Sequence, residues 1–157
     1  MLRFSRLADY AVLLMTHMAQ DAPDSVHNAL GMAQATGVPV PTVSKILARL
    51  ARKGLLGSTR GVKGGYHLSR PASGISVADI VTAMDGPVAL THCVRTGPVT
   101  ACGVESLCPS RFSLNRINHA VSAALESVTL ADLAQPPSFP PIAPRAEHEH
   151  APAVAQT

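Results

Sequence analysis

The segment from Val38 to Gly54 limits the possible folds of this chain more than any other. Its stiff start, Val38-Pro39-Val40-Pro41, favours a turn and then a helix, because proline at the first helical position lacks only an N–H that has no partner there. Apolar residues then recur at helical spacing and form one stripe, made of Val43, Ile46, Leu47 and Leu50. The pattern predicts a helix that begins at Pro41 and ends before Gly54.

The residues of this helix outside the apolar stripe are small and polar at its start and basic afterwards: Thr42, Ser44, Lys45, Arg49 and Arg52. A shorter helix is predicted before it, from about residue 28 to residue 36, and Gly37 is a natural stop. Its inward-facing side chains are expected to be Leu30, Met32 and Ala33. Two short helices joined by a tight turn predict a helix-turn-helix, whose second helix enters the major groove of DNA.

Two short extended runs follow, residues 55–60 and 66–70, around the turn Gly61-Val62-Lys63-Gly64-Gly65. This pattern predicts a β-hairpin. Glycines beside Arg60 and Lys63 could also cradle a nucleotide phosphate, but no Lys-Ser/Thr pair completes a P-loop. We therefore interpret the hairpin as a DNA-contacting wing, and we expect Arg60 at its rim to enter a minor groove, where the negative potential is concentrated.

Helical patterns flank the helix-turn-helix on both sides. Ser5 can cap a first helix that runs to about Gln20, and Ser76 can cap another from about Val77 to Met84. Beyond Pro109 an apolar pattern keeps helical spacing and fades near residue 133, through Phe112, Leu114, Ile117, Val121, Leu125 and Val128. The predicted fold is mainly α: a winged helix-turn-helix with a small β-hairpin wing and a long C-terminal dimerisation helix.

Charge is distributed unevenly along the chain. Residues 1–70 carry nine Lys and Arg against three acids, whereas residues 71–157 carry four against seven. Six of the nine cations fall between Lys45 and Lys63, a density suited to neutralising phosphates. With no Trp and few other aromatic residues, base stacking on single strands is unfavourable, so duplex DNA is the expected partner.

All three cysteines lie in one segment rich in Gly and Pro, with the spacing C-x8-C-x5-C: Cys93, Cys102 and Cys108. An odd count without a secretion signal argues against a disulfide framework and favours a reducing compartment, so we expect a cytoplasmic protein. No early apolar run approaches the ~20 residues that span a bilayer. Three thiolates are one short of the usual four ligands of a zinc ion or a small iron–sulfur cluster, so a fourth ligand is open.

These patterns predict four regions. Residues 1–88 are expected to form the winged helix-turn-helix domain, 89–109 the cysteine loop, and 110–135 the dimerisation helix. Six prolines among the last 22 residues, and the loss of the apolar pattern, predict a disordered tail over 136–157.

Several motifs together resemble one family. They are Ser5-Arg6-Leu7-Ala8-Asp9-Tyr10-Ala11, the helix from Pro41 to Lys53 with Gly54-Leu55-Leu56 after it, the wing from Arg60 to Tyr66, and three cysteines before a long helix. This set is similar to the winged-helix regulators that include IscR, NsrR and RirA. It most closely resembles the regulators of SUF-system iron–sulfur assembly, through Cys108-Pro109 and Arg116-Ile117-Asn118.

The resemblance implies a dimeric transcription factor, expected to be a repressor of iron–sulfur assembly and iron homeostasis genes. It implies a 2Fe-2S or 4Fe-4S cluster on Cys93, Cys102 and Cys108, and DNA binding that changes when the cluster is lost, oxidised or nitrosylated. The first cysteine gap is longer than usual in the family, and Arg111 replaces a histidine that follows the last cysteine in IscR-like members. As fourth ligand we favour Asp9 of the opposite subunit over His92.

The residues expected to contact a palindromic operator are Pro41, Thr42, Ser44, Lys45, Arg49, Arg60 and Lys63. Other interpretations of the cysteines remain open. They are a nitric-oxide-sensing or redox-sensing repressor of the same fold, a structural zinc-binding DNA module, and a thiol switch that uses a Cys102–Cys108 disulfide without metal. An enzyme is not expected, because no nucleophile–base pair or phosphate loop is found.

Overall fold

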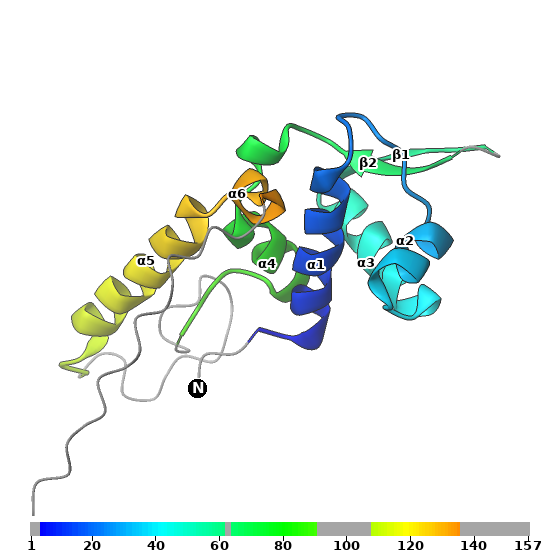
Figure 1. Ribbon diagram of the computed structural model, residues 1–157. Coiled ribbons are helices and arrows are strands. Elements are labelled where there is room, and N and C mark those ends of the chain that lie inside the picture. The colour runs from blue at the N-terminus through cyan, green and yellow to red at the C-terminus, as the bar shows by residue number, and fades with distance from the viewer. Residues whose placement is uncertain (1–3, 62–63, 91–107, 136–157) are drawn as a thin grey trace, which may run out of the picture.

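The computed structural model describes residues 4–61, 64–90 and 108–135 (Figure 1). Its elements follow the chain in the order α1 (Arg6–Gln20), α2 (Ala29–Thr36), α3 (Val40–Arg52), β1 (Leu56–Thr59), β2 (Gly65–Leu68), a short 3-10 helix η1 (Ala72–Gly74), α4 (Val77–Asp85), α5 (Arg111–Ser127) and α6 (Leu130–Ala134). The two strands pair antiparallel, with Leu56 opposite Leu68 and Thr59 opposite Gly65. The predicted mainly α, winged helix-turn-helix fold is confirmed.

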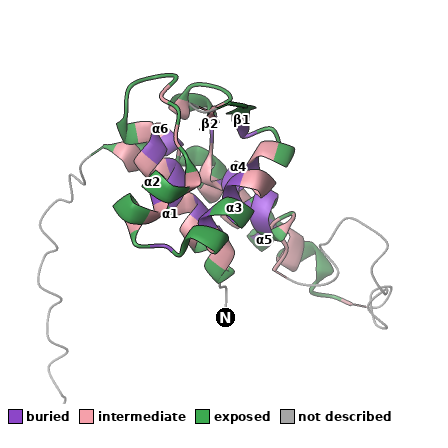
Figure 2. Cartoon of the chain, turned by 90° about the vertical axis from the view of Figure 1, so that its right-hand side faces the viewer, coloured by how far each residue is buried: buried purple, intermediate pink, exposed green. Residues whose placement is uncertain are grey.

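The apolar core lies where α1, α3 and α4 meet. The four residues of the predicted α3 stripe, Val43, Ile46, Leu47 and Leu50, are fully buried in it. They pack with residues of α1 and α4, including Leu14, Met15 and Ile80. Figure 2 shows the buried colour concentrated on these central helices. Because the apolar face of α3 is buried in this core, the helix cannot rotate, and its basic face is held on the outside of the molecule.

The helix ends follow the predicted capping residues. The Ser5 hydroxyl accepts a hydrogen bond from the Ala8 N–H at 3.1 Å, and Ser76 forms a reciprocal capping box with Asp79 at the start of α4. Gly37 ends α2 with φ of +74°, a left-handed conformation that glycine adopts without strain. Local side-chain chemistry therefore sets these boundaries.

Two details of the helix-turn-helix differ from the prediction. Helix α3 begins at Val40, after Pro39 as cap, so Pro41 occupies its second position. In α2, Met32 is buried but Leu30 is 58% exposed. Two residues two positions apart lie about 200° apart around a helix, so α2 cannot turn both Leu30 and Met32 inward.

The C-terminal segment 110–135 is two helices rather than the single helix predicted from its apolar pattern. Helix α5 ends at Ser127, Val128 is extended, and Thr129 caps α6. The extended residues pair with the chain at the start of α4: the Val77 N–H donates to the Val128 carbonyl at 2.9 Å. Leu130 follows and is fully buried. Residues 128–134 therefore complete the core of the winged-helix domain, because α6 packs on α1 and η1.

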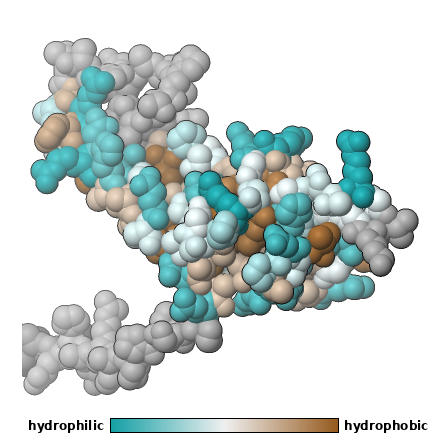
Figure 3. Space-filling model, turned by 90° about the horizontal axis from the view of Figure 1, so that it is seen from above, coloured by the Kyte–Doolittle hydropathy of each residue, from teal (hydrophilic) through white to brown (hydrophobic). Residues whose placement is uncertain are grey.

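Helix α5 and the wing extend to opposite sides of the molecule (Figure 1). In the view from above, hydrophilic side chains gather beside the wing tip, and hydrophobic and hydrophilic ones alternate along the α5 end (Figure 3). Phe112 is 73% exposed and Ile117 52% exposed on α5. The helix thus carries apolar side chains that this single chain leaves in contact with water.

Candidate nucleic-acid interface and cysteine segment

The outer face of α3 presents most of the predicted DNA-contacting side chains together. Pro41, Ser44 and Lys45 are exposed, and Thr42 is half-buried in the first turn. These residues occupy the amino-terminal half of the helix, the part that reaches base edges in helix-turn-helix proteins. The arrangement can read a major groove, and the contacts themselves remain predictions.

Arg49 lies further along α3 and is half-buried. Its Nε donates a hydrogen bond to the Ala83 carbonyl oxygen at 3.0 Å, in the last turn of α4. Carbonyls in the last turn of a helix lack partners within the helix and carry partial negative charge, so a guanidinium is a favourable partner. Arg49 therefore joins α3 to α4 through its Nε, and the terminal nitrogens of its guanidinium take no part in that bond.

The wing places Arg60 directly after β1, exposed at the end of the hairpin. Gly61 follows with φ of +116°, a conformation that favours glycine over residues with a side chain. Ser58 and Thr59 are also exposed on β1 and were not among the predicted contacts. Lys63 lies outside the described residues.

The base of the wing is fixed to the connector between α1 and α2. The backbone of His27 exchanges two hydrogen bonds with Tyr66 on β2, both of 2.8 Å. This isolated antiparallel bridge joins the connector to β2 of the two-stranded hairpin, next to Gly65. A methyl group on Gly65 would lie 2.5 Å from the His27 carbonyl oxygen. The wing angle is therefore set by the connector, a relationship that no sequence motif indicated.

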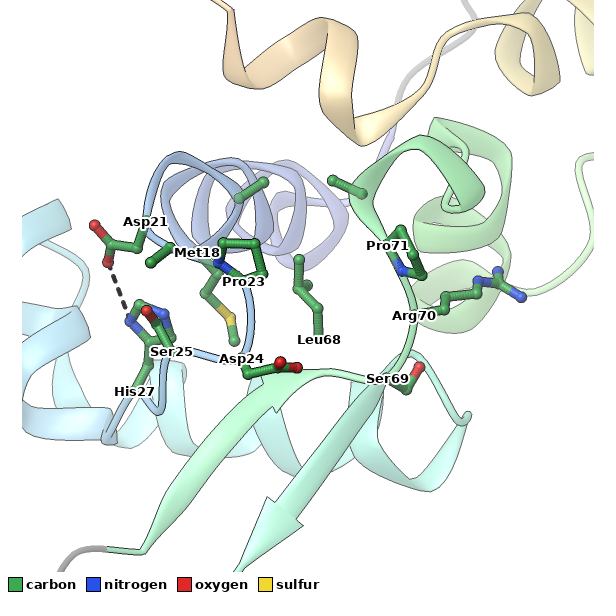
Figure 4. Close-up of a pocket in the computed structure, with 13 residues that line it drawn as sticks. Met18, Asp21, Pro23, Asp24, Ser25, His27, Leu68, Ser69, Arg70 and Pro71 are labelled. Carbon is green, nitrogen blue, oxygen red and sulfur yellow. Dashed lines mark ion pairs between the residues drawn. The ribbon is translucent and has the colours of Figure 1, made fainter.

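An open cavity of about 450 Å³ lies beside this bridge, between the end of α1, the connector and the chain after β2 (Figure 4). Met18 and Leu68 contribute apolar surface to it. On one side His27 pairs with Asp21, with 3.7 Å between Nδ1 and Oδ2. Burial lowers the pKa of His27, the Asp21 carboxylate raises it, and nearby His17 lowers it. The net shift is downward, which favours neutral imidazole at this position.

The predicted metal ligands are only partly within the described residues. Cys108 is half-buried and lies three residues before α5, whereas Cys93, Cys102 and His92 lie outside the described ranges. Asp9 is exposed on α1. Among described residues no group of three or more His, Cys, Asp or Glu side chains is placed to hold a metal. The ligand set therefore stays a prediction.

Asn118 is a structurally important residue that the sequence interpretation did not single out. It is the buried residue of α5 in the described structure, 8% exposed. Its side-chain amide bonds to the backbone on both sides of Ala89, just before the cysteine segment. A signal was available, because Asn118 is a polar residue in the apolar register of Leu114, Val121 and Leu125.

Across the ranges that the structure describes, no helix is both long enough and apolar enough to cross a bilayer.

The sequence is similar to two known transcriptional regulators over most of its length. It is 34% identical over 133 residues to Rv1287 of Mycobacterium tuberculosis, a protein provisionally named as an HTH-type transcriptional regulator; the match covers 85% of this chain and 81% of that protein. It is 28% identical over 132 residues to the HTH-type transcriptional regulator IscR of Yersinia pseudotuberculosis, with 84% and 79% covered.

Solved structures have the same fold. CymR of B. subtilis, described as the global cysteine regulator of that organism, superposes with a TM-score of 0.66 at 26% identity, over 85% of this chain and 97% of that chain. IscR of T. potens superposes with a TM-score of 0.63 at 25% identity, over 84% and 85%. Both similarities extend over the wing domain and beyond it.

A family model described as an iron-dependent transcriptional regulator matches residues 4–136. The match includes the helix-turn-helix, the wing, the cysteine segment and α5. The chain belongs to the Rrf2 family and is a winged-helix transcriptional regulator, not an enzyme.

Proposed function

We propose that this protein is a DNA-binding repressor of iron–sulfur assembly and iron homeostasis genes that senses an iron–sulfur cluster held by Cys93, Cys102 and Cys108. The observation that carries the proposal is that the segment with these cysteines is attached at both ends to α5. Cys108 lies three residues before the start of α5, and Asn118 on α5 holds Leu90, three residues before Cys93. Helix α5 in turn packs on α4 of the DNA-binding domain.

The donor set fits an iron–sulfur cluster chemically. Cysteine thiolates are the usual ligands of such clusters, and a chain that leaves and returns to one helix can bring three of them to one point. Asp9 on the exposed face of α1 is the proposed fourth ligand, supplied by a second subunit. A bound cluster supplies a group that oxygen or nitric oxide destroys, which is the chemical property a sensor needs.

Two copies of the chain are proposed to pair through α5. The exposed apolar side chains Phe112 and Ile117 support this pairing, because a second copy would remove them from water. Dimeric helix-turn-helix proteins read two half-sites about 34 Å apart, or a multiple of it. The proposed partner is therefore a palindromic duplex operator, contacted by α3 in the major groove and by Arg60 in the minor groove.

Anaerobic purification tests the cofactor. A brown protein with visible absorption and matching iron and sulfide counts is the expected result. Replacing any one of Cys93, Cys102 or Cys108 by Ser is expected to abolish stable binding. A colourless protein with one zinc per chain would overturn the proposal in favour of a structural zinc module.

Substitutions that differ in the kind of DNA contact test the interface. Arg60→Ala is expected to weaken binding to the cognate operator more than to random duplex. Lys53→Ala, at the exposed residue that caps the end of α3, is expected to weaken both about equally and to flatten the salt dependence. Equal losses for the two variants on every sequence would contradict the wing assignment.

A second candidate is a metal-free thiol switch within the same fold. It is favoured by the similarity to Staphylococcus aureus CymR, solved in an oxidised form, with a TM-score of 0.65 at 26% identity. In this case Cys102 and Cys108 would form the disulfide. Oxidation would then remove two titratable thiols, and the purified protein would contain no metal.

A further inference from the structure

Asn118 is buried without belonging to the apolar core. Its exposed fraction is 8%, whereas its neighbour Ile117 is 52% exposed. The main cluster of buried core residues in the described structure contains no residue of α5. The position of Asn118 is therefore better explained by its polar contacts than by the packing of the domain.

Both faces of the Asn118 amide bond to one short stretch of backbone. The Leu90 N–H donates to Oδ1 at 3.0 Å, and Nδ2 donates to the Val88 carbonyl oxygen at 3.2 Å. A neighbouring β-strand would satisfy the same two backbone groups in the same way. Asparagine can do so because its side chain carries an acceptor and a donor together. Aspartate of the same shape would keep the acceptor and lose the donor.

This clamp fixes the entry to the cysteine segment. Leu90 precedes Cys93 by three residues, and Cys108 precedes Arg111, the first residue of α5, by three. The segment between them thus starts and ends on α5, once through Asn118 and once through the chain itself. Holding both ends close together lowers the conformational entropy that is lost when the thiolates gather.

A chain of direct contacts leads from this clamp to the DNA-reading helix. Helix α5 packs on α4. Near the end of α4, the Ala83 carbonyl accepts the hydrogen bond from Arg49 on α3. Residues 86–90 connect the end of α4 to the clamp through the backbone. A change in the backbone of residues 88–90 therefore reaches α4 in two ways, directly along the chain and through Asn118 and α5. From α4 it reaches the recognition helix α3 through Arg49.

We propose that Asn118 is the positioning residue through which the state of the cysteines is transmitted to α5 and to DNA binding. The inference rests on the proposed sensing function. When the thiolates gather at one point, the backbone of residues 88–90 shifts. The two hydrogen bonds of Asn118 pass this shift on to α5. Because such coupling is reciprocal, binding of DNA changes the retention of the cluster through the same residue.

The clamp is tested first, in the full-length protein without metal. Asn118→Leu removes both hydrogen bonds and keeps the number and branching of the side-chain heavy atoms, and Asn118→Asp keeps the acceptor for Leu90. Hydrogen exchange at the Leu90 amide is expected to be about tenfold faster in Asn118→Leu and intermediate in Asn118→Asp. Asn115→Leu is the matched control, a half-buried asparagine one turn earlier on α5. Equal exchange in all four proteins would overturn the clamp.

The transmission is tested by the ratio of DNA dissociation constants with and without cluster, after anaerobic reconstitution with ferrous iron and sulfide. In Asn118→Leu this ratio is expected to fall several-fold towards one, and Asn118→Asp to recover part of it. Asn115→Leu is expected to keep the wild-type ratio. An unchanged ratio in an Asn118→Leu protein that has lost Leu90 protection would mean that Asn118 is only structural.

A separate arm distinguishes failure of this inference from failure of the proposed function. If the wild-type protein acquires no visible absorption on reconstitution, the cluster proposal fails. The same ratio is then measured between reduced protein and protein alkylated with N-ethylmaleimide. If this ratio of dissociation constants differs between the wild type and Asn118→Leu, the result supports the transmission through Asn118. If the ratio is the same in both proteins, the transmission is overturned.

Discussion

The Nε of Arg49 donates a hydrogen bond to the Ala83 carbonyl oxygen at 3.0 Å and so joins the middle of the recognition helix to the end of α4. The same residue belongs to the basic outer face of α3. One side chain is therefore shared between the interior of the domain and the expected DNA surface. The position of α4 and the expected DNA-contacting face of α3 are therefore linked through this side chain.

Arg49→Lys is expected to separate these two roles. The lysine ammonium can replace the bond to Ala83 or a phosphate contact, but it lacks the several nitrogens needed for both. Specific affinity for an operator selected from random sequences should fall several-fold, and the salt dependence should stay close to that of the wild type. Fluorescence anisotropy on operator and random duplex measures both. Arg52→Lys, at an exposed site one turn later, is the control; an equal loss there would refute the shared role.

Leu130→Ala is expected to destabilise the DNA-binding domain, although it lies 42 residues beyond the predicted end of that domain at residue 88. Leu130 is fully buried, and truncating a buried leucine costs about 2–5 kcal/mol. Urea unfolding followed by circular dichroism measures the loss. Leu30→Ala, at a site 58% exposed on α2, should change the stability little. A Leu130→Ala protein as stable as the wild type would contradict the packing of α6 on α1.

The pH dependence of stability should reveal His27. Burial lowers the pKa of His27 from its ordinary value of 6.5, so the unfolded chain binds more protons than the folded one at mildly acidic pH. The contribution of His27 is therefore fully present above about pH 6.5 and is lost as the pH falls through the folded pKa. His27→Gln should flatten the loss of stability between about pH 7 and pH 5. Identical stability curves for wild type and His27→Gln would exclude the effect.

Gly65→Ala should disturb the base of the wing. The new methyl group would lie 2.5 Å from the His27 carbonyl oxygen, so the connector and β2 must move apart. Such overpacking typically costs about 1–3 kcal/mol. Thermal unfolding measures the cost, and operator binding should weaken along with it. Gly74→Ala is the control, because its methyl would meet only the Arg70 Cδ at 3.9 Å. A wild-type melting curve for Gly65→Ala would argue against the His27–Tyr66 bridge.

Much of the fold could be predicted because local chemistry determines it. Ser5 and Ser76 cap helices as expected, and the stripe led by Val43 is buried. The hairpin also appears where glycines interrupt two extended runs. These features depend on residues close together in the sequence, where helical period and turn preferences are reliable guides.

The remaining features depend on contacts between distant residues. The end of α5 at Ser127 follows from the pairing of residues 128–130 with residues 75–77, which the apolar spacing around Val128 does not reveal. The wing bridge between His27 and Tyr66 and the clamp of Asn118 are likewise made across the fold. For the candidate site, the basic face of α3 was predictable from composition and period, whereas the attachments that position it were not.

The pairing of Val77 with Val128 has a consequence for how such regulators can diversify. The chain leaves the domain after α4 at Gly86 and returns at Val128, beside the first residue of the same helix. The intervening residues form an excursion whose two ends are fixed by a helix of nine residues. An insertion with fixed ends can be lengthened, re-spaced or exchanged while the DNA-reading domain keeps its core. A regulator with this fold can therefore come to respond to a different chemical signal when only the residues between Gly86 and Val128 are replaced.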